Sequence, residues 1–458
     1  MDRRRFIGTG LRSAAGIWGS AGIVGSAGLA AGSGMLSGCG ADRGADRAAD
    51  RAAGPTANPF GGAELQKLRD DHRRLLFDAY LPFWEKGGYD EARGGFMCYL
   101  HDDGSVQDGR KDIWYQGRGI WVYSFLYNEI DRSQKWLDMA ARSRDFMVRY
   151  MHRGDGTWLD TVDRDGAPAQ GIDFSRDDNI YGALFAAVGL IQLARANGKQ
   201  EDLDLARRTI EKSVERYEDP AYAGVKVAES AASGLRAQGH SFMFVWVLPQ
   251  FLELAPDERF EQLLAEHLDH IEHDFWNSAY RISNEVLNHD YSRIPALSGQ
   301  MVPGHSIETQ WMAAAAAGRA GDVERQERFR MRMRRLIEMS WDYNFGGIGD
   351  TDYRVFADAN HARGPEFDIK SMWSQTEVAV GSLRAASETN AQWAAEWYRR
   401  SWDYILAKMQ TDYGVWRQAV DRFGAGVDRD GISPYRKGNF HQPRCLMMNL
   451  LEIERMLG

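Results

Sequence analysis

Two kinds of helix alternate along the chain from residue 65 onward. The first kind carries apolar residues at three- and four-residue spacing, as in Leu137, Ala140, Ala141 and Met147, with polar residues between them. This period is that of an amphipathic helix that buries one face. The pattern predicts six such helices, over residues 65–83, 136–150, 203–217, 260–275, 324–341 and 392–409.

The second kind of helix is apolar on nearly every side, which indicates burial all round. Six of these are expected to begin near Trp114, Asn179, Gly239, Gly304, Trp373 and Phe440. Successive starts lie 65, 60, 65, 69 and 67 residues apart, and a nearly fixed period indicates a repeat architecture. The sequence therefore predicts an all-α fold of six helical hairpins, with an inner ring of helices wrapped by an outer ring.

Short strand-like runs join some of these helices. They begin at Gly94, Gly156 and Gly414, and two of them reach turns that end in glycine, at Gly104 and Gly166. Such runs are typical of short β-hairpins. Hairpins gathered on one rim of a closed ring would surround the mouth of a pocket, which is a common place for a small-molecule site.

The first sixty residues have the composition of an export signal and a tether. Arg3 and Arg4 form a twin-arginine pair, an uncharged Gly/Ala-rich stretch follows, and Cys39 ends a segment similar to a bacterial lipobox. A low-complexity run rich in Ala-Asp-Arg comes next. We therefore expect a signal peptide over 1–38, a flexible tether over 39–60 and one barrel domain over 61–458. Lipid on Cys39 would make the protein a cell-envelope lipoprotein that touches the membrane only there.

Composition narrows the classes of partner. The chain has 458 residues, a net charge of −9 and no basic stripe, which argues against nucleic-acid binding. Two further cysteines, Cys98 and Cys445, show no disulfide framework spacing and are expected to be free thiols. The oligomeric state stays open, with a homodimer as one option.

The candidate chemistry lies at the starts of the predicted inner helices. Three of the eleven histidines, His240, His305 and His441, stand there in three different repeats. Glu308 follows His305 by three residues on the same helical face, so it is expected to orient the imidazole and support its charge. A metal site is disfavoured, because no second histidine follows at the fourth position. Other polar residues at these helix starts are Arg118, Gln375, Glu377 and Arg444.

Inverting glycoside hydrolysis is the alternative chemistry. It needs two carboxylates that flank the scissile bond. Asp177, Asp178, Asp368 and Glu377 are available, but no two of them stand out as a pair. The histidines therefore favour acid–base chemistry.

Three motifs resemble the N-acylglucosamine 2-epimerase family. They are Lys111-x-x-Trp114-x-Gln116-Gly117-Arg118-x-x-Trp121, Pro303-Gly304-His305-x-x-Glu308 and Phe440-His441-x-Pro443-Arg444. They occur in the family's order, and the resemblance runs from about residue 65 to the end of the chain. It implies an (α/α)6 barrel.

The resemblance also implies proton exchange at C2 of an open-chain aldose, without an organic cofactor. His305 and His441 would be the acid–base groups on opposite faces of C2, and Arg118 would stabilise the enediolate. Glu308 would hold His305, and His240 would be a third histidine near the sugar. The expected substrate contacts are His240, Trp114, Trp373, Gln375, Glu377 and Arg444.

One segment departs from the family pattern. Family epimerases often carry a Trp-Trp pair and then a histidine, whereas this chain has a single Trp373 and places Gln375 at the histidine position. The substrate therefore stays open between N-acetylglucosamine with N-acetylmannosamine, plain mannose, glucose or fructose, and the reducing end of a disaccharide such as cellobiose. A non-catalytic sugar-binding lipoprotein on the same barrel is a further option. The glycine-rich 346–349 segment is interpreted as an ordinary turn and not as a nucleotide site.

Overall fold

The computed structural model describes residues 57–168, 179–225, 227, 232–350, 352–353, 368–427 and 435–458. Cys39 and the predicted signal and tether up to residue 56 lie outside the described residues, as do Asp177 and Asp178.

Six inner helices form a closed ring, as the hydrophobic pattern predicts. They are α4 (Ile113–Phe125), α6 (Ile180–Asn197), α8 (Gln238–Leu254), α10 (Pro303–Arg319), α12 (Met372–Thr389) and α14 (His441–Leu457). Each packs against the next, and contacts between α14 and the end of the first inner helix close the ring. Every start lies within one residue of the predicted position, and structural neighbours described below share this (α/α)6 barrel.

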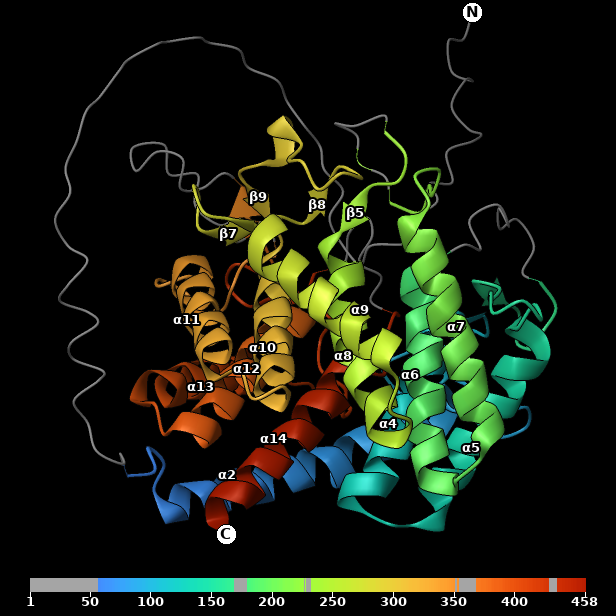
Figure 1. Cartoon of the computed structure of the whole chain (residues 1–458). Helices are drawn as coiled ribbons and strands as arrows, with labels where there is room; N and C mark the ends of the chain where they lie inside the picture. The colour runs from blue at the N-terminus through green and yellow to red at the C-terminus, as the bar shows by residue number, and fades with distance from the viewer. Residues whose placement is uncertain are drawn as a thin grey trace, which may run out of the picture.

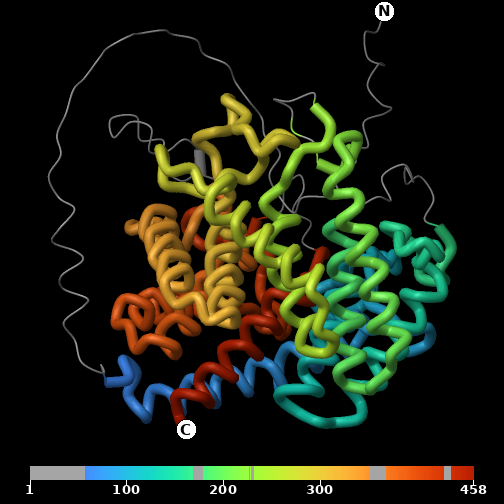
Figure 2. Tube along the Cα trace, viewed as in Figure 1, coloured from blue at the N-terminus to red at the C-terminus, as the bar shows by residue number. Residues whose placement is uncertain are grey.

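The outer ring is made of amphipathic helices. They are α2 (Gly62–Arg74), α5 (Gln134–Met151), α7 (Gln200–Glu218), α9 (Glu258–Asp269), α11 (Val323–Ser340) and α13 (Gln392–Tyr404). Five of them pack on the inner helix that precedes them. The sixth pair joins the beginning and the end of the described chain, because α2 packs on α14. These are the blue and red helices in Figure 1 and in the trace of Figure 2.

Several helices continue into short turns of other types. Leu75–Tyr80, Trp84–Gly88, Leu126–Ile130, His270–Asp274 and Ile405–Met409 are π-helical, α3 spans Leu81–Phe83, and Pro295–Leu297 is a 3-10 turn. The inner helix α6 is long and apolar enough to cross a membrane, but it lies buried in the barrel.

Short strands link the repeats. β1 (Tyr99–Leu100) with β2 (Val106–Asp108) and β6 (Trp276–Asn277) with β7 (Ile282–Ser283) form local hairpins. Four pairs join strands from different connections: β3 (Lys111–Asp112) with β4 (Thr161–Val162), β5 (Arg236–Ala237) with β8 (Val286–Leu287), β9 (Gln300–Met301) with β10 (Asp352–Tyr353), and β11 (Ile369–Ser371) with β12 (Ala419–Asp421). Figure 1 shows β5, β7, β8 and β9 together at one end of the barrel, where α8 and α10 begin.

Two buried lysines hold loops in place at the end of the barrel where the inner helices begin. The ammonium group of Lys111 contacts Asp90 at 3.0 Å and the Gly94 carbonyl at 2.8 Å. Lys370 repeats the arrangement with Asp342 and Gly346, at 3.0 and 2.6 Å. The glycine-rich 346–349 segment is thus a rim loop that Lys370 anchors.

Cys98 and Cys445 are buried free thiols, as expected.

Candidate active site

The candidate side chains come from matching places in the repeats. His240, His305 and Ser374 are each the third residue of an inner helix. Ser374 and His441 each precede a glutamine that binds the backbone of a rim loop: Gln375 bonds both the N–H and the carbonyl of Ile348, and Gln442 bonds Trp416 and Gly414. The repeat geometry therefore directs three histidines to the same end of the barrel.

His305 is held by a carboxylate from a rim loop. Its Nδ1 lies 2.9 Å from Oε1 of Glu285, which sits between β7 and β8. A carboxylate oxygen only accepts, so Nδ1 carries the hydrogen and donates this bond. The expectation that Glu308 fixes His305 is wrong about the partner, because Glu285 occupies that place.

Charge around His305 favours its protonated form. Burial alone lowers the pKa of His305, but the Glu285 carboxylate, with Glu308 and Asp350, raises it by more. The net pKa lies above the usual value for a histidine.

His441 has a different environment. Its Nδ1 lies 3.0 Å from Oε1 of Glu377, a carboxylate with no exposed surface. The guanidinium of Arg444 approaches the same nitrogen to 3.3 Å. Burial and the positive charges of Arg118 and Arg444 hold the pKa of His441 well below its usual value. His441 is therefore neutral at pH 7, whereas the surroundings of His305 favour the cation.

Trp373 lies close to both imidazoles. Its ring centroid lies 4.7 Å from that of His305 and 5.8 Å from that of His441. Gly304, the glycine before His305, makes this approach feasible, since a Cβ there would come within 2.5 Å of the indole. The two histidines, 136 positions apart in the sequence, thus contact one side chain.

A buried ion-pair network lies next to the histidines. Arg444 contacts Glu308 at 2.8 Å and also pairs with Glu377, and all three side chains are at most 3% exposed. Ligand atoms of Glu308, Glu377 and His441 lie within 4.8 Å of one another, which is close enough to hold a metal ion. Because the Arg444 guanidinium already contacts both carboxylates, it supplies the positive charge that a metal would bring.

The guanidinium of Arg118 packs against three aromatic rings. Its guanidinium carbon is 4.2 Å from the Phe185 ring centroid and 4.8 Å from those of Trp114 and Phe440. Its Nε is buried without a hydrogen-bond partner. Burial lowers the pKa of Arg118 to about 10, which leaves it charged at neutral pH and able to stabilise an anion.

The remaining predicted contacts differ in their surroundings. His240 is buried, its Nδ1 has no partner, and burial lowers its pKa to about 3. The Trp114 Nε1 is also buried and unpartnered. The Gln375 amide, in contrast, is engaged with backbone atoms of Ile348 and Ser371. These bonds hold the rim loop in place, so Gln375 supports the site through the loop and its amide is not available as the predicted substrate contact.

Sequence reasoning missed Glu285. The available signal was a single carboxylate within an otherwise uncharged rim segment, Ile282 to Leu287. Nothing in the spacing connects Glu285 with His305, because strand pairing between β5 and β8 brings the segment to the site.

A hydrolase pair is not assembled among the described residues. Asp368 is exposed, and Glu377 is enclosed by Arg444 and by the Trp311 Nε1, which donates to it at 3.0 Å. The other two candidates, Asp177 and Asp178, lie outside the described residues.

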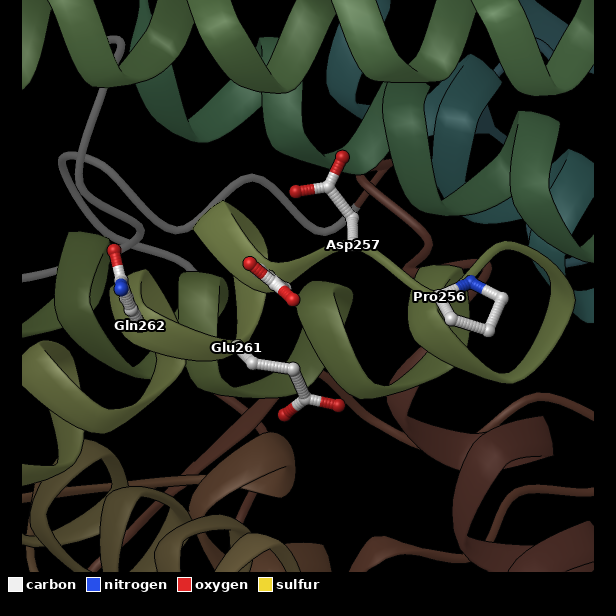
Figure 3. Close-up of a pocket in the computed structure, with 5 residues that line it drawn as sticks. Pro256, Asp257, Glu261 and Gln262 are labelled. Atoms are coloured by element: carbon white, nitrogen blue, oxygen red, sulfur yellow. The ribbon is translucent and has the colours of Figure 1, made fainter.

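A shallow hollow occurs elsewhere, on the connection between α8 and α9 (Figure 3). Pro256, Asp257, Glu258, Glu261 and Gln262 line it. Asp257 caps α9, and Glu261 pairs with Arg319 at 2.8 Å. Asp257 and Glu261 therefore have structural roles.

Comparisons with known proteins identify the family of the chain. The cellobiose 2-epimerase structure from Spirochaeta thermophila superposes with a TM-score of 0.72 at 17% identity, over 86% of this chain and 98% of that one. The N-acylglucosamine 2-epimerase of Mus musculus is 26% identical over 83% of this chain and 90% of the mouse protein. The cellobiose 2-epimerase of Ruminococcus albus is 25% identical over 82% and 96%. The family model for N-acylglucosamine 2-epimerase (GlcNAc 2-epimerase) matches residues 94–441. With its three motifs inside or at the edge of that span, the chain belongs to the N-acylglucosamine 2-epimerase family.

Proposed function

We propose that this sugar epimerase inverts C2 of a free aldose, with His441 removing the C2 proton from one face and His305 delivering a proton to the opposite face. The observation that carries the proposal is the opposite protonation preference of two imidazoles beside one indole. Environments that push two pKa values apart identify an acid and a base.

The reaction is written on an open-chain aldose. Neutral His441 removes the C2 proton through Nε2, and the C–H electrons form the C1=C2 bond while charge moves to the C1 oxygen. Protonated His305 then delivers its proton to the opposite face of C2, and the carbonyl reforms. The other epimer reacts by the same steps in reverse, from the enzyme form in which His441 carries the proton. Between turnovers His441 loses its proton to solvent and His305 takes one up, which restores the starting form. Each positioned acid–base group of this kind contributes about 10²–10⁴-fold.

Arg118 supports the step in which charge develops. Its partner-free Nε and aromatic surroundings provide a fixed positive charge in a dry site. A fixed charge stabilises an enediolate oxygen better than water does, because it needs no reorganisation. The positive charge of Arg444 helps to keep His441 neutral, and Glu377 orients its imidazole.

We place N-acetylglucosamine and N-acetylmannosamine first among the substrates. The support is the stronger similarity to N-acylglucosamine 2-epimerases than to cellobiose 2-epimerases, over matches of nearly equal length. The test is incubation with N-acetylglucosamine, glucose, mannose and cellobiose, with chromatographic separation of the C2 epimers. Formation of N-acetylmannosamine from N-acetylglucosamine supports this order, and conversion of cellobiose alone reverses it.

A non-catalytic sugar-binding protein on this barrel would have no need for the acid–base set. Here Arg118, His305, Glu308 and His441 are all retained, and each imidazole has its own carboxylate. We therefore propose catalysis. Failure to convert any sugar of the panel would favour the binding function.

The Glu285→Gln variant tests the His305 assignment through pH. The amide keeps a hydrogen-bond acceptor for Nδ1 but removes the charge that raises the pKa of His305. Because proton donation needs protonated His305, activity is lost as pH rises through that pKa. The alkaline limb of the kcat/KM profile is expected to move to lower pH in the variant.

The matched control is Glu215→Gln, which changes an exposed glutamate paired with Lys212. Its profile should coincide with that of the unmodified enzyme. An unmoved alkaline limb in Glu285→Gln would contradict the assignment of His305 as the proton donor.

We further propose that the protein is exported and carries lipid on Cys39. The support is the order of the twin-arginine pair and the lipobox-like segment. Cys39→Ser is expected to move the protein from the membrane fraction to the soluble fraction of a fractionated host cell. Unchanged membrane association of Cys39→Ser would refute the lipid anchor.

A further inference from the structure

Two buried polar side chains beside His305 have atoms without partners. Gln238, the first residue of α8, has no exposed surface, and neither its Oε1 nor its Nε2 makes a hydrogen bond. Glu285 uses Oε1 for His305, while its Oε2 is buried and unpartnered. Buried polar groups are nearly always bonded, so such atoms need an explanation.

Backbone and side-chain contacts place Gln238 next to the candidate acid. The Gln238 N–H donates to the Glu285 carbonyl at 2.9 Å. The side chain of the same Glu285 binds His305 at 2.9 Å. One residue therefore connects Gln238 with the imidazole.

The repeat gives the direction of the Gln238 side chain. Asn439 stands two residues before His441, as Gln238 stands two before His240, and its side chain donates to the Tyr115 carbonyl at 2.9 Å. Ile113 holds the same place in α4, and a Cβ on Gly182 would lie 2.8 Å from its side chain. Tyr115 and Gly182 are both third residues of the following inner helix. The same relation would place the Gln238 side chain against the third residue of α10, which is His305.

Other buried glutamines of the barrel show what a structural role looks like. Gln116 binds the Phe96 N–H and carbonyl, at 2.7 and 2.9 Å, and Gln375 binds Ile348 in the same way. Gln238 is equally buried and binds nothing through its side chain. Its amide therefore contributes no bond to the stability of the ligand-free protein and carries a desolvation cost.

We propose that Gln238 and the second oxygen of Glu285 form a substrate subsite, in which they bind polar substituents adjacent to C2 of the open-chain sugar. This inference rests on the proposed function. The carboxamide donates one bond and accepts another, which matches a hydroxyl or an acetamido group, and the Glu285 oxygen accepts from a hydroxyl. Bonds made only when sugar is present hold C2 against His305 and make Gln238 a specificity-determining residue.

The test is Gln238→Met, which keeps the length of the side chain and removes both polar atoms. In the ligand-free protein this substitution removes only polar atoms that have no hydrogen-bond partner, so the Tm of the variant is expected to rise. The kcat/KM for N-acetylglucosamine is expected to fall about 10-fold or more, which is the loss of one substrate hydrogen bond of about 1.4 kcal/mol or more. The acyclic, unreactive N-acetylglucosaminitol should raise the Tm of the unmodified enzyme more than that of the variant.

Gln375→Met is the matched control, because it removes three side-chain hydrogen bonds to backbone and should lower Tm. A Tm of Gln238→Met that falls as in this control, or an unchanged kcat/KM, would overturn the subsite while the unmodified enzyme remains an epimerase. An unmodified enzyme that converts no sugar of the panel would instead overturn the proposed function, and the subsite with it.

Discussion

His305→Ala and His441→Ala are each expected to abolish epimerisation while the barrel stays folded. Each variant removes one of two proton carriers that serve opposite faces of C2. The expected loss in kcat reaches the upper end of the range of about 10²–10⁴-fold, or more, because inversion needs both groups. Epimer formation from N-acetylglucosamine, followed by chromatography, measures the loss.

The two single variants should also differ from each other in exchange. In D2O, each retains one base and is expected to wash deuterium into C2 of one epimer without inverting it. His72→Ala is the matched control, since His72 is a fully buried histidine stacked on Trp402, outside the site. It should lose thermal stability and keep epimerase activity per folded molecule. Loss of activity only in proportion to unfolding, in all three variants, would show that the histidines are structural.

Arg444→Met is expected to destabilise the protein by about 3–5 kcal/mol, because it leaves Glu308 and Glu377 as uncompensated buried charges. The measurement is the free energy of unfolding from urea titration. Arg384→Met removes an i,i+4 pair with Glu388 at the helix surface and should cost under about 0.5 kcal/mol.

Neutralising the two carboxylates provides a second check of the network. Adding Glu308→Gln and Glu377→Gln to Arg444→Met should recover a large part of the lost stability, since no unpaired charge then remains. An Arg444→Met variant with the stability of the unmodified protein would contradict the ion-pair network.

The inner ring could be predicted closely because full burial imposes an apolar sequence. The starts near Asn179 and Gly304 are also marked locally: the Asn179 side chain caps the N–H groups of Tyr181 and Gly182, and Pro303 opens α10. The π-helical ends of the outer helices carried no such signal. Pairing of α2 with α14 follows from ring closure between the two ends of the chain and has no local pattern.

The structure brings most of the predicted residue types to one end of the barrel, but several of their contacts differ from those that the spacing suggested. Helical spacing suggested Glu308 as the partner of His305, but Arg444, from another repeat, engages Glu308. Glu285 takes the role through strand pairing on the rim. Gln375 looked like a substrate contact because it follows Trp373 in a familiar motif, yet its amide holds a loop. Packing between residues that are far apart in the sequence determines these side-chain partners, and the spacing of residues along one sequence does not reveal such packing.

Solvent deuterium at C2 tests the central claim most directly. The unmodified enzyme is incubated with N-acetylglucosamine in D2O, and both epimers are analysed by NMR at low conversion. If His441 and His305 act on opposite faces of C2, the N-acetylmannosamine formed should carry one deuterium at C2, while the remaining N-acetylglucosamine stays largely protonated there. Product that forms without deuterium at C2 would contradict delivery of a solvent-exchanged proton by His305.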